Sequence, residues 1–205
     1  MKKNYYHIQR IGVYRANRPY YKVGDIVKTN DFNPYFEYYN SYIHPNLTVN
    51  LNTPEEFQLS RLKMLEAVSS SSITMKDQVE VAKIGELIAQ HFITYTRELV
   101  FEAVRAEKFP HLPSRQKCIW VVDSLDGLKH WKSRLPPASG YDIEVFKVDI
   151  QGNIHSASEE HLLYGEFLHS EMIDAANKYW NGTISETIRK ETLFEGEMRI
   201  LEKIQ

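Results

Sequence analysis

The sequence lacks the features of secreted and membrane-spanning proteins. Its 205 residues include one cysteine, Cys118, which cannot form an internal disulfide, so a disulfide-stapled extracellular domain is excluded. No apolar run approaches the roughly 18 residues that a membrane span requires, and the first residues carry no apolar signal segment. These absences predict a cytoplasmic protein without a membrane partner.

A large excess of charge of one sign is also lacking. The 27 Asp and Glu residues against 25 Lys and Arg residues leave a net charge of −2. A dedicated nucleic-acid-binding domain would usually carry a basic excess, so composition gives no support for one. The apolar share of 42% and the charged share of 25% are those of an ordinary globular chain, and the length predicts a single domain over residues 1–205.

Several common sites are missing. No two of the eight histidines stand three or four residues apart, so a helical zinc site of the HExxH type is excluded and no metal site is predicted. Neither a GxGxxG nor a GxxxxGK[ST] phosphate loop occurs, and there is no GxSxG nucleophile turn. Cys118 follows the same trend, because it lies in an apolar run and is interpreted as a core thiol rather than a nucleophile.

Hydrophobic patterning predicts strands near both ends of the chain with helices between them. The expected strands cover Tyr5–Arg10, Asp25–Lys28, Lys117–Val122, Tyr141–Ile150 and Glu191–Ile204, with turns at Gln151–Asn153 and Gly196. The expected helices cover Thr53–Val68, Met75–Lys108 with a break near Thr94–Thr96, Ser124–Leu135 and Glu159–Tyr179. Because these elements do not alternate regularly as β-α-β units, the pattern favours an α+β fold.

Aromatic residues crowd the N-terminal region, where nine of the thirteen tyrosines lie within the first 42 residues. Helical periodicity is absent there, so short strands and turns are expected. Two interpretations stay open: the tyrosines pack against a sheet, or they form a partly polar wall for a planar ligand. His91, on the long helix, is interpreted as a hydrogen-bonded core residue rather than a ligand.

Three short segments place polar groups at the ends of expected strands. Tyr5-Tyr6-His7-Ile8 carries a histidine on the first strand and is followed by Gly24-Asp25. Pro113-Ser114-Arg115 precedes the buried strand that contains Cys118-Ile119-Trp120. Glu191-Thr192-Leu193 opens the last strand.

The order of these segments resembles the ADP-ribosyltransferase fold, in its branch shared by diphtheria toxin and poly(ADP-ribose) polymerases. It is similar to small prokaryotic ADP-ribosyltransferase-like domains of unassigned function. The resemblance implies a split sheet of mixed or antiparallel strands with inserted and flanking helices. It also implies that His7 holds a ribose of NAD, that a middle strand lines the nicotinamide pocket, and that Glu191 stabilises the oxocarbenium-like transition state.

The residue types suit that chemistry. Cleavage of the nicotinamide–ribose bond develops positive charge on the ribose, which an ionised carboxylate stabilises more in the transition state than in the ground state. A histidine can fix a ribose hydroxyl, and an arginine can bind a pyrophosphate through two parallel donors. We therefore expect Glu191 as the catalytic carboxylate, with Glu195 next in line, and His7, Ser114 and Arg115 as NAD-binding residues, the last two at the rim of one cleft.

The function expected from the resemblance is transfer of ADP-ribose from NAD to an unidentified intracellular acceptor (protein, nucleic acid or small molecule), or hydrolysis of NAD. A toxin, a phage-defence factor or a drug-modifying enzyme would fit. The alternative is a non-catalytic interaction module that keeps the fold without the chemistry. It is favoured by the lack of a tyrosine after the middle strand to stack on nicotinamide.

Overall fold

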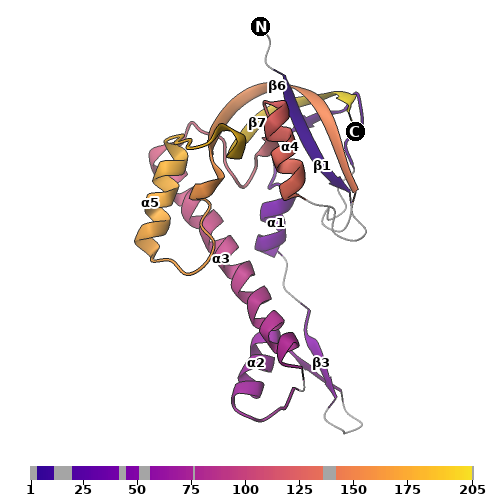
Figure 1. The fold of residues 1–205 in the computed structure, drawn as a ribbon, viewed down its shortest axis with the longest axis vertical. Helices are drawn as coiled ribbons and strands as arrows, with labels where there is room; N and C mark the ends of the chain where they lie inside the picture. Colours follow the sequence, from indigo (N-terminus) through magenta and orange to yellow (C-terminus); the bar gives the residue numbers. More distant parts are fainter. Residues whose placement is uncertain are drawn as a thin grey trace. The chain divides into compact units, whose positions relative to one another are not determined.

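The computed structural model describes residues 4–11, 20–41, 45–50, 56–75, 77–135 and 142–204 (Figure 1). Contacts divide the chain into two compact units. The first consists of Met1–Tyr38 and Arg97–Gln205, and the second of Tyr39–Thr96. Two helices, α1 (Pro34–Ser41) and α3 (Gln78–Lys108), contribute residues to both units. None of the described helices is long and apolar enough to cross a membrane.

The first unit is built on an antiparallel sheet. Its strands are β1 (Tyr5–Ile11), β2 (Ile26–Lys28), β5 (Ile119–Val121), β6 (Asp142–Ser158) and β7 (Lys190–Lys203). The order is β1-β6-β7-β2, and β5 pairs with β7 as well. The first half of β7 pairs with β5 and its second half with β2, so two short strands share one edge of β7. With its helices, this antiparallel sheet makes the fold α+β, as expected.

The two long strands, β6 and β7, pass without a turn through the glycines at which the sequence predicted turns (Figure 1). Gly152 and Gly196 are register partners with φ of 154° and 151°. A Cβ on Gly152 would lie 2.2 Å from the Glu195 carbonyl oxygen, and one on Gly196 would lie 2.3 Å from that of Gln151. The predicted turns are therefore wrong: these glycines allow two backbones to approach closely within one continuous strand pair.

Helices pack on the sheet, and one of the apolar clusters they form with it lies beside the start of β7. The remaining helices of this unit are α4 (Leu125–Arg134), α5 (His169–Trp180) and the short 3₁₀ segments η1 (Glu159–His161) and η2 (Thr187–Arg189). Phe101 of α3, Tyr179 and Trp180 of α5 and Leu193 of β7 are each at most 2% exposed and belong to one core cluster. This packing brings the C-terminal part of α3 and the face of α5 against the start of β7.

The second unit contains a hairpin and a short helix that the sequence did not predict in this form. It consists of β3 (Leu47–Asn50), β4 (Glu56–Leu59), α2 (Arg61–Ser69) and the first part of α3, with Met64 and Ile84 at its core. The helix expected from Thr53 begins instead at Arg61, because Ser60 accepts a hydrogen bond from the Lys63 amide at 3.3 Å and caps it. Thr53–Glu55 lie outside the described residues.

Three further expectations about the helices are wrong. The break near Thr94–Thr96 is not found, since α3 is continuous from Gln78 to Lys108. The helix expected over Glu159–Tyr179 is instead η1, a connecting segment and α5. Helix α1 forms where no helix was expected, because the Asn33 side chain accepts from the Phe36 amide at 2.8 Å and Pro34 occupies the first turn.

Candidate functional site

Three strands bring together the polar segments singled out in the sequence. The Nδ1 atom of His7 on β1 lies 3.0 Å from the Trp120 carbonyl oxygen on β5. Because a carbonyl only accepts, Nδ1 carries the proton. The indole Nε1 of Trp120 in turn donates to Glu191 Oε1 on β7 at 2.6 Å. One chain of contacts therefore runs from His7 through Trp120 to Glu191.

Glu191 is the meeting point of this site, and it is 6% exposed. Oε1 accepts from Trp120, while Oε2 accepts from the Tyr179 hydroxyl at 2.5 Å and from Arg115 Nη1. A carboxylate offers about four acceptor positions, and the donors among the described residues use one of the two on Oε1. The carboxylate is thus held by the protein and keeps acceptor capacity on Oε1.

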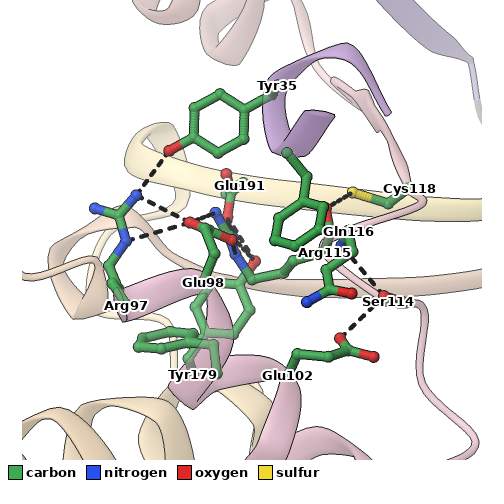
Figure 2. A network of polar contacts seen from close by, with 12 residues as sticks. Tyr35, Arg97, Glu98, Glu102, Ser114, Arg115, Gln116, Cys118, Tyr179 and Glu191 are labelled. Carbon is green, nitrogen blue, oxygen red and sulfur yellow. Dashed lines mark hydrogen bonds and ion pairs between the residues drawn. The ribbon is translucent and has the colours of Figure 1, made fainter. Parts of the chain in front are cut away.

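Arg115 links Glu191 to a second buried carboxylate, as Figure 2 shows. Its Nε donates to Glu98 Oε2 at 2.8 Å and its Nη2 to Glu98 Oε1 at 3.2 Å. Arg97 donates to the same Oε1 from Nη2 at 2.9 Å. Arg97, Glu98, Arg115 and Glu191 form a ladder of alternating sign that sums to zero, and we call these four residues the charge ladder.

Burial opposes the charges of Glu98 and Arg115, and the neighbouring charges outweigh it. Burial alone would raise the pKa of Glu98, but the charges and hydrogen bonds of Arg115 and Arg97 lower it below its ordinary value. Likewise, burial alone would lower the pKa of Arg115, but Glu191 and Glu98 raise it well above its ordinary value. Both groups are therefore ionised at neutral pH.

Two further groups beside the ladder stay protonated. Burial, together with the Glu191 carboxylate, raises the pKa of the Tyr179 hydroxyl well above its usual range, against the opposing charge of Arg115. Burial raises the pKa of the Cys118 thiol in the same way. Cys118 is 1% exposed, and its Sγ donates to the Arg115 carbonyl at 3.5 Å. The interpretation of Cys118 as a core thiol therefore fits the structure.

Ser114 and Arg115 were expected at an exposed rim, and that placement is wrong, since they are 5% and 2% exposed. The reason is the carboxamide of Asn33, which donates to the carbonyls of Arg115 at 2.7 Å and Cys118 at 3.1 Å and holds this segment beneath α1. Arg115 pairs with Glu98 and Glu191. Its guanidinium makes four hydrogen bonds within the protein.

Ser114 lies between two other carboxylates. Its amide donates to Glu195 Oε2 at 2.8 Å, and its hydroxyl donates to Glu102 Oε2 at 2.9 Å. Arg105 neutralises Glu102 through Nη2 at 2.7 Å. Glu195, the second candidate for the catalytic carboxylate, therefore supports the backbone of the Ser114–Arg115 segment.

Some of the N-terminal aromatic residues line this region. The Tyr35 hydroxyl accepts from Arg97 Nη2 at 2.8 Å (Figure 2), and its ring meets the Trp120 ring edge-on with centroids 5.6 Å apart. The Tyr21 ring lies 5.5 Å from that of His7. Both interpretations of these tyrosines therefore stay open, since the rings pack against site residues and are themselves half-buried.

Sequence reasoning missed Arg97, Glu98 and Tyr179. On the long helix the apolar Leu99 is 42% exposed, while Arg97, Glu98 and Phe101 are at most 1% exposed. A signal was present, since Arg97, Glu98, Phe101 and Val104 follow the three- and four-residue spacing of a buried helix face. Charged residues on such a face point to a buried ionic network. His91 is 9% exposed and stacks near Tyr39 and Phe92, as a core residue does.

Comparison with known proteins gives a family without an assigned activity. No curated protein matches the chain. Among the described residues, no group of three or more His, Cys, Asp and Glu side chains could hold a metal ion. The model of the family described as DUF2441, protein of unknown function, matches residues 5–205. The match covers nearly the whole chain, and the protein therefore belongs to the DUF2441 family.

Proposed function

We propose that the protein binds NAD beside Glu191 and transfers its ADP-ribose to an acceptor nucleophile or to water. The observation that carries the proposal is the carboxylate of Glu191, held by Trp120, Arg115 and Tyr179 with one acceptor position left on Oε1. Of the segments that resemble the NAD-binding segments of ADP-ribosyltransferases, the one containing Arg115 bonds this carboxylate directly, and His7 bonds the backbone of Trp120, whose indole donates to it. Such proximity supports the proposal.

The proposed reaction breaks the bond between C1′ of the ribose and the nicotinamide nitrogen. The electron pair leaves with nicotinamide, which departs as a neutral molecule, and positive charge develops on the ribose ring. Glu191 stabilises that charge and accepts a hydrogen bond from a ribose hydroxyl at Oε1. The acceptor, or a water molecule, then forms the new bond at C1′ and loses its proton to solvent.

Residues around Glu191 are proposed to contact other parts of NAD. His7 lies one hydrogen bond from the backbone of Trp120 and is proposed to contact a ribose. The rings of Trp120 and Tyr35 contact each other edge-on, and we propose that they form one wall of the site for a flat ligand. Arg115 is not proposed as a pyrophosphate ligand, because its guanidinium is buried and already makes four hydrogen bonds, to Glu98, Glu191 and Tyr179.

The test is release of nicotinamide from NAD, measured by chromatography for the parent and for Glu191→Gln. Glutamine keeps the size and loses the charge, so the rate should fall about 10²-fold or more, as for loss of a preorganised electrostatic group. NAD affinity should change less. Circular dichroism checks that the variant is folded. Turnover at the parental rate would remove Glu191 from the mechanism and make Glu195 the next candidate.

A matched control is Glu159→Gln. The Glu159 side chain is 8% exposed and accepts from Arg189 Nε at 2.9 Å, so it is a buried carboxylate in an ion pair like Glu191. Its substitution removes a carboxylate of equal side-chain exposure outside the proposed site, where the partner, Arg189, is 40% exposed. Parental turnover in Glu159→Gln and loss in Glu191→Gln would separate chemistry from folding.

A second candidate function is the non-catalytic interaction module. It is favoured by the low exposure of the Glu191 side chain, 8%, and by its three protein donors, which together suit a structural ion pair. Such a module would release no nicotinamide at any protein concentration. The same chromatographic assay therefore decides between the two candidates.

A further inference from the structure

The charge ladder is larger than neutralising Glu191 requires. Arg115 alone supplies one positive charge against the Glu191 carboxylate, yet Glu98 and Arg97 add a second ion pair. All four side chains are at most 8% exposed. Burying charges is costly, and apolar replacements of buried ion pairs are often as stable or more so. Stability alone therefore does not account for the second pair.

The second pair fixes the plane of the Arg115 guanidinium. One edge of that planar group, Nε and Nη2, lies against Glu98 Oε2 and Oε1 at 2.8 and 3.2 Å. The other side, Nη1, donates to Glu191 and to the Tyr179 hydroxyl, the latter at 2.7 Å. A guanidinium held on both sides cannot rotate about its side chain, so the direction of its Nη1–H bonds is set.

Glu98 is itself anchored from behind. Arg97 donates to Glu98 Oε1 from Nε at 3.2 Å and from Nη2 at 2.9 Å. The same Nη2 donates to the Tyr35 hydroxyl at 2.8 Å (Figure 2). Each group in the ladder is therefore oriented by the one before it, and the last group oriented is the carboxylate of Glu191.

We propose that Arg115 is a positioning residue that fixes the carboxylate of Glu191, and that Glu98 acts on Glu191 through Arg115. Glu98 shares no hydrogen bond with Glu191, so an effect of Glu98 on that carboxylate has to be transmitted by the guanidinium. The catalytic consequence rests on the proposed function, while the positioning itself does not.

The kinetic test uses variants that keep the charges, Arg115→Lys and Glu98→Asp. Lysine is a point charge that cannot reproduce two fixed edges, and aspartate is one methylene shorter. For both variants kcat per folded molecule should fall about 10-fold to 10²-fold, because misplacing a reacting group is costly. The KM for NAD should stay within about twofold, since the proposed function puts neither residue in contact with NAD. A raised KM with unchanged kcat, or no change in either, overturns the proposal.

A second measurement reads the same contact without activity. The indole N–H groups of Trp131 and Trp180 donate to backbone carbonyls, whereas that of Trp120 donates to Glu191 Oε1. In a ¹⁵N-tryptophan NMR spectrum, the Trp120 indole signal is assigned by its loss in Trp120→Phe. That signal should move in Arg115→Lys and in Glu98→Asp. Glu159→Gln should leave it in place. An unmoved signal in folded Glu98→Asp overturns the proposal.

The two measurements keep the two hypotheses apart. If the parent protein releases no nicotinamide, the proposed function is wrong, and the indole signal alone decides whether Arg115 and Glu98 position Glu191. If the parent is active and the signal does not move, the positioning proposal is wrong and the proposed function stands. If one variant does not fold, the other carries both measurements.

Discussion

Neutralising Glu98 should destabilise the protein far more than neutralising a glutamate on its surface. Glu98 is 0% exposed and receives hydrogen bonds from both Arg97 and Arg115. In Glu98→Gln the two guanidiniums remain buried and lose the carboxylate between them, while Glu191 still pairs with Arg115. Breaking a buried ion pair by removing one partner costs about 3–5 kcal/mol, because the other charge is left uncompensated. That is a large part of the roughly 5–15 kcal/mol that stabilises a typical domain.

A second substitution tests whether the loss comes from charge imbalance. Removing Arg97 as well, in Arg97→Gln/Glu98→Gln, restores a neutral pair of Arg115 and Glu191. The double variant should therefore lose less than the sum of the two single losses, by about 1–3 kcal/mol. Urea denaturation followed by circular dichroism measures all three free energies of unfolding. Additivity to within about 0.5 kcal/mol would refute the ladder as one electrostatic unit.

A surface pair gives the scale for comparison. Lys63 and Glu66 form an ion pair at 2.7 Å with both side chains more than half exposed. Glu66→Gln should change the free energy of unfolding by less than about 1 kcal/mol, because exposed pairs are solvated and pay side-chain entropy. A loss as large as that of Glu98→Gln would mean that burial is not the cause.

The same charge predicts the pH dependence of stability. The pKa of Glu98 is lower in the folded protein than in the unfolded chain, where a glutamate has a pKa of about 4.3. Glu98 therefore contributes its stability above about pH 4.3 and loses it as the pH falls towards its lower folded pKa. As the pH falls from about 5 to about 2, the free energy of unfolding of the parent should decrease more than that of Glu98→Gln. Parallel curves would contradict this assignment.

Two further predictions concern the backbone and the thiol. Gly196→Ala should lower the free energy of unfolding by several kcal/mol in urea denaturation, because its Cβ would lie 2.3 Å from the Gln151 carbonyl oxygen. Gly85→Ala in α3 should instead raise it by about 0.5–1 kcal/mol, since the nearest atom, of Leu65, is 4.0 Å away. Equal effects would refute the role of the close strand approach. Iodoacetamide at pH 8 should leave Cys118 unmodified in the folded protein and alkylate it in urea, as mass spectrometry would show, because burial raises the pKa of its thiol.

The sequence predicted the elements that carry strong local patterns. The apolar run before Asp123 became β5, and the capped amphipathic segment after it became α4, with Ser124 accepting from the Gly127 amide at 3.1 Å. Helix α1 had a readable signal in Asn33-Pro34, which the surrounding tyrosines obscured. Gly152 and Gly196 were misread because a glycine that permits a turn also permits close strand pairing. Only the register between β6 and β7 distinguishes the two.

The candidate site was predictable in part. Local sequence identifies residue types at strand ends, and it brought attention to His7, Arg115 and Glu191. It does not give the direction of a side chain, which for Arg115 depends on Asn33 holding the backbone of its segment from 82 residues away. It also does not give partners across the fold: Glu98 lies 17 residues before Arg115 and Glu191 lies 76 after it. Such pairs are set by packing of α3, α5 and β7.

The contacts of His7 are compatible with a structural role as well as with the proposed contact to a ribose. Its hydrogen bond to the Trp120 carbonyl, at 3.0 Å, gives it a structural role in holding β1 against β5. The same bond fixes the ring next to the residue that donates to Glu191, where it is proposed to contact a ribose of NAD. In His7→Ala the lost hydrogen bond should cost about 0.5–1.5 kcal/mol, which lowers the melting temperature by a few degrees (about 2–6 °C). NAD affinity, measured by calorimetry below that temperature, should fall about 10-fold if the ribose contact exists. A lower melting temperature with unchanged affinity would leave His7 only its structural role, and unchanged values of both would remove it from the site.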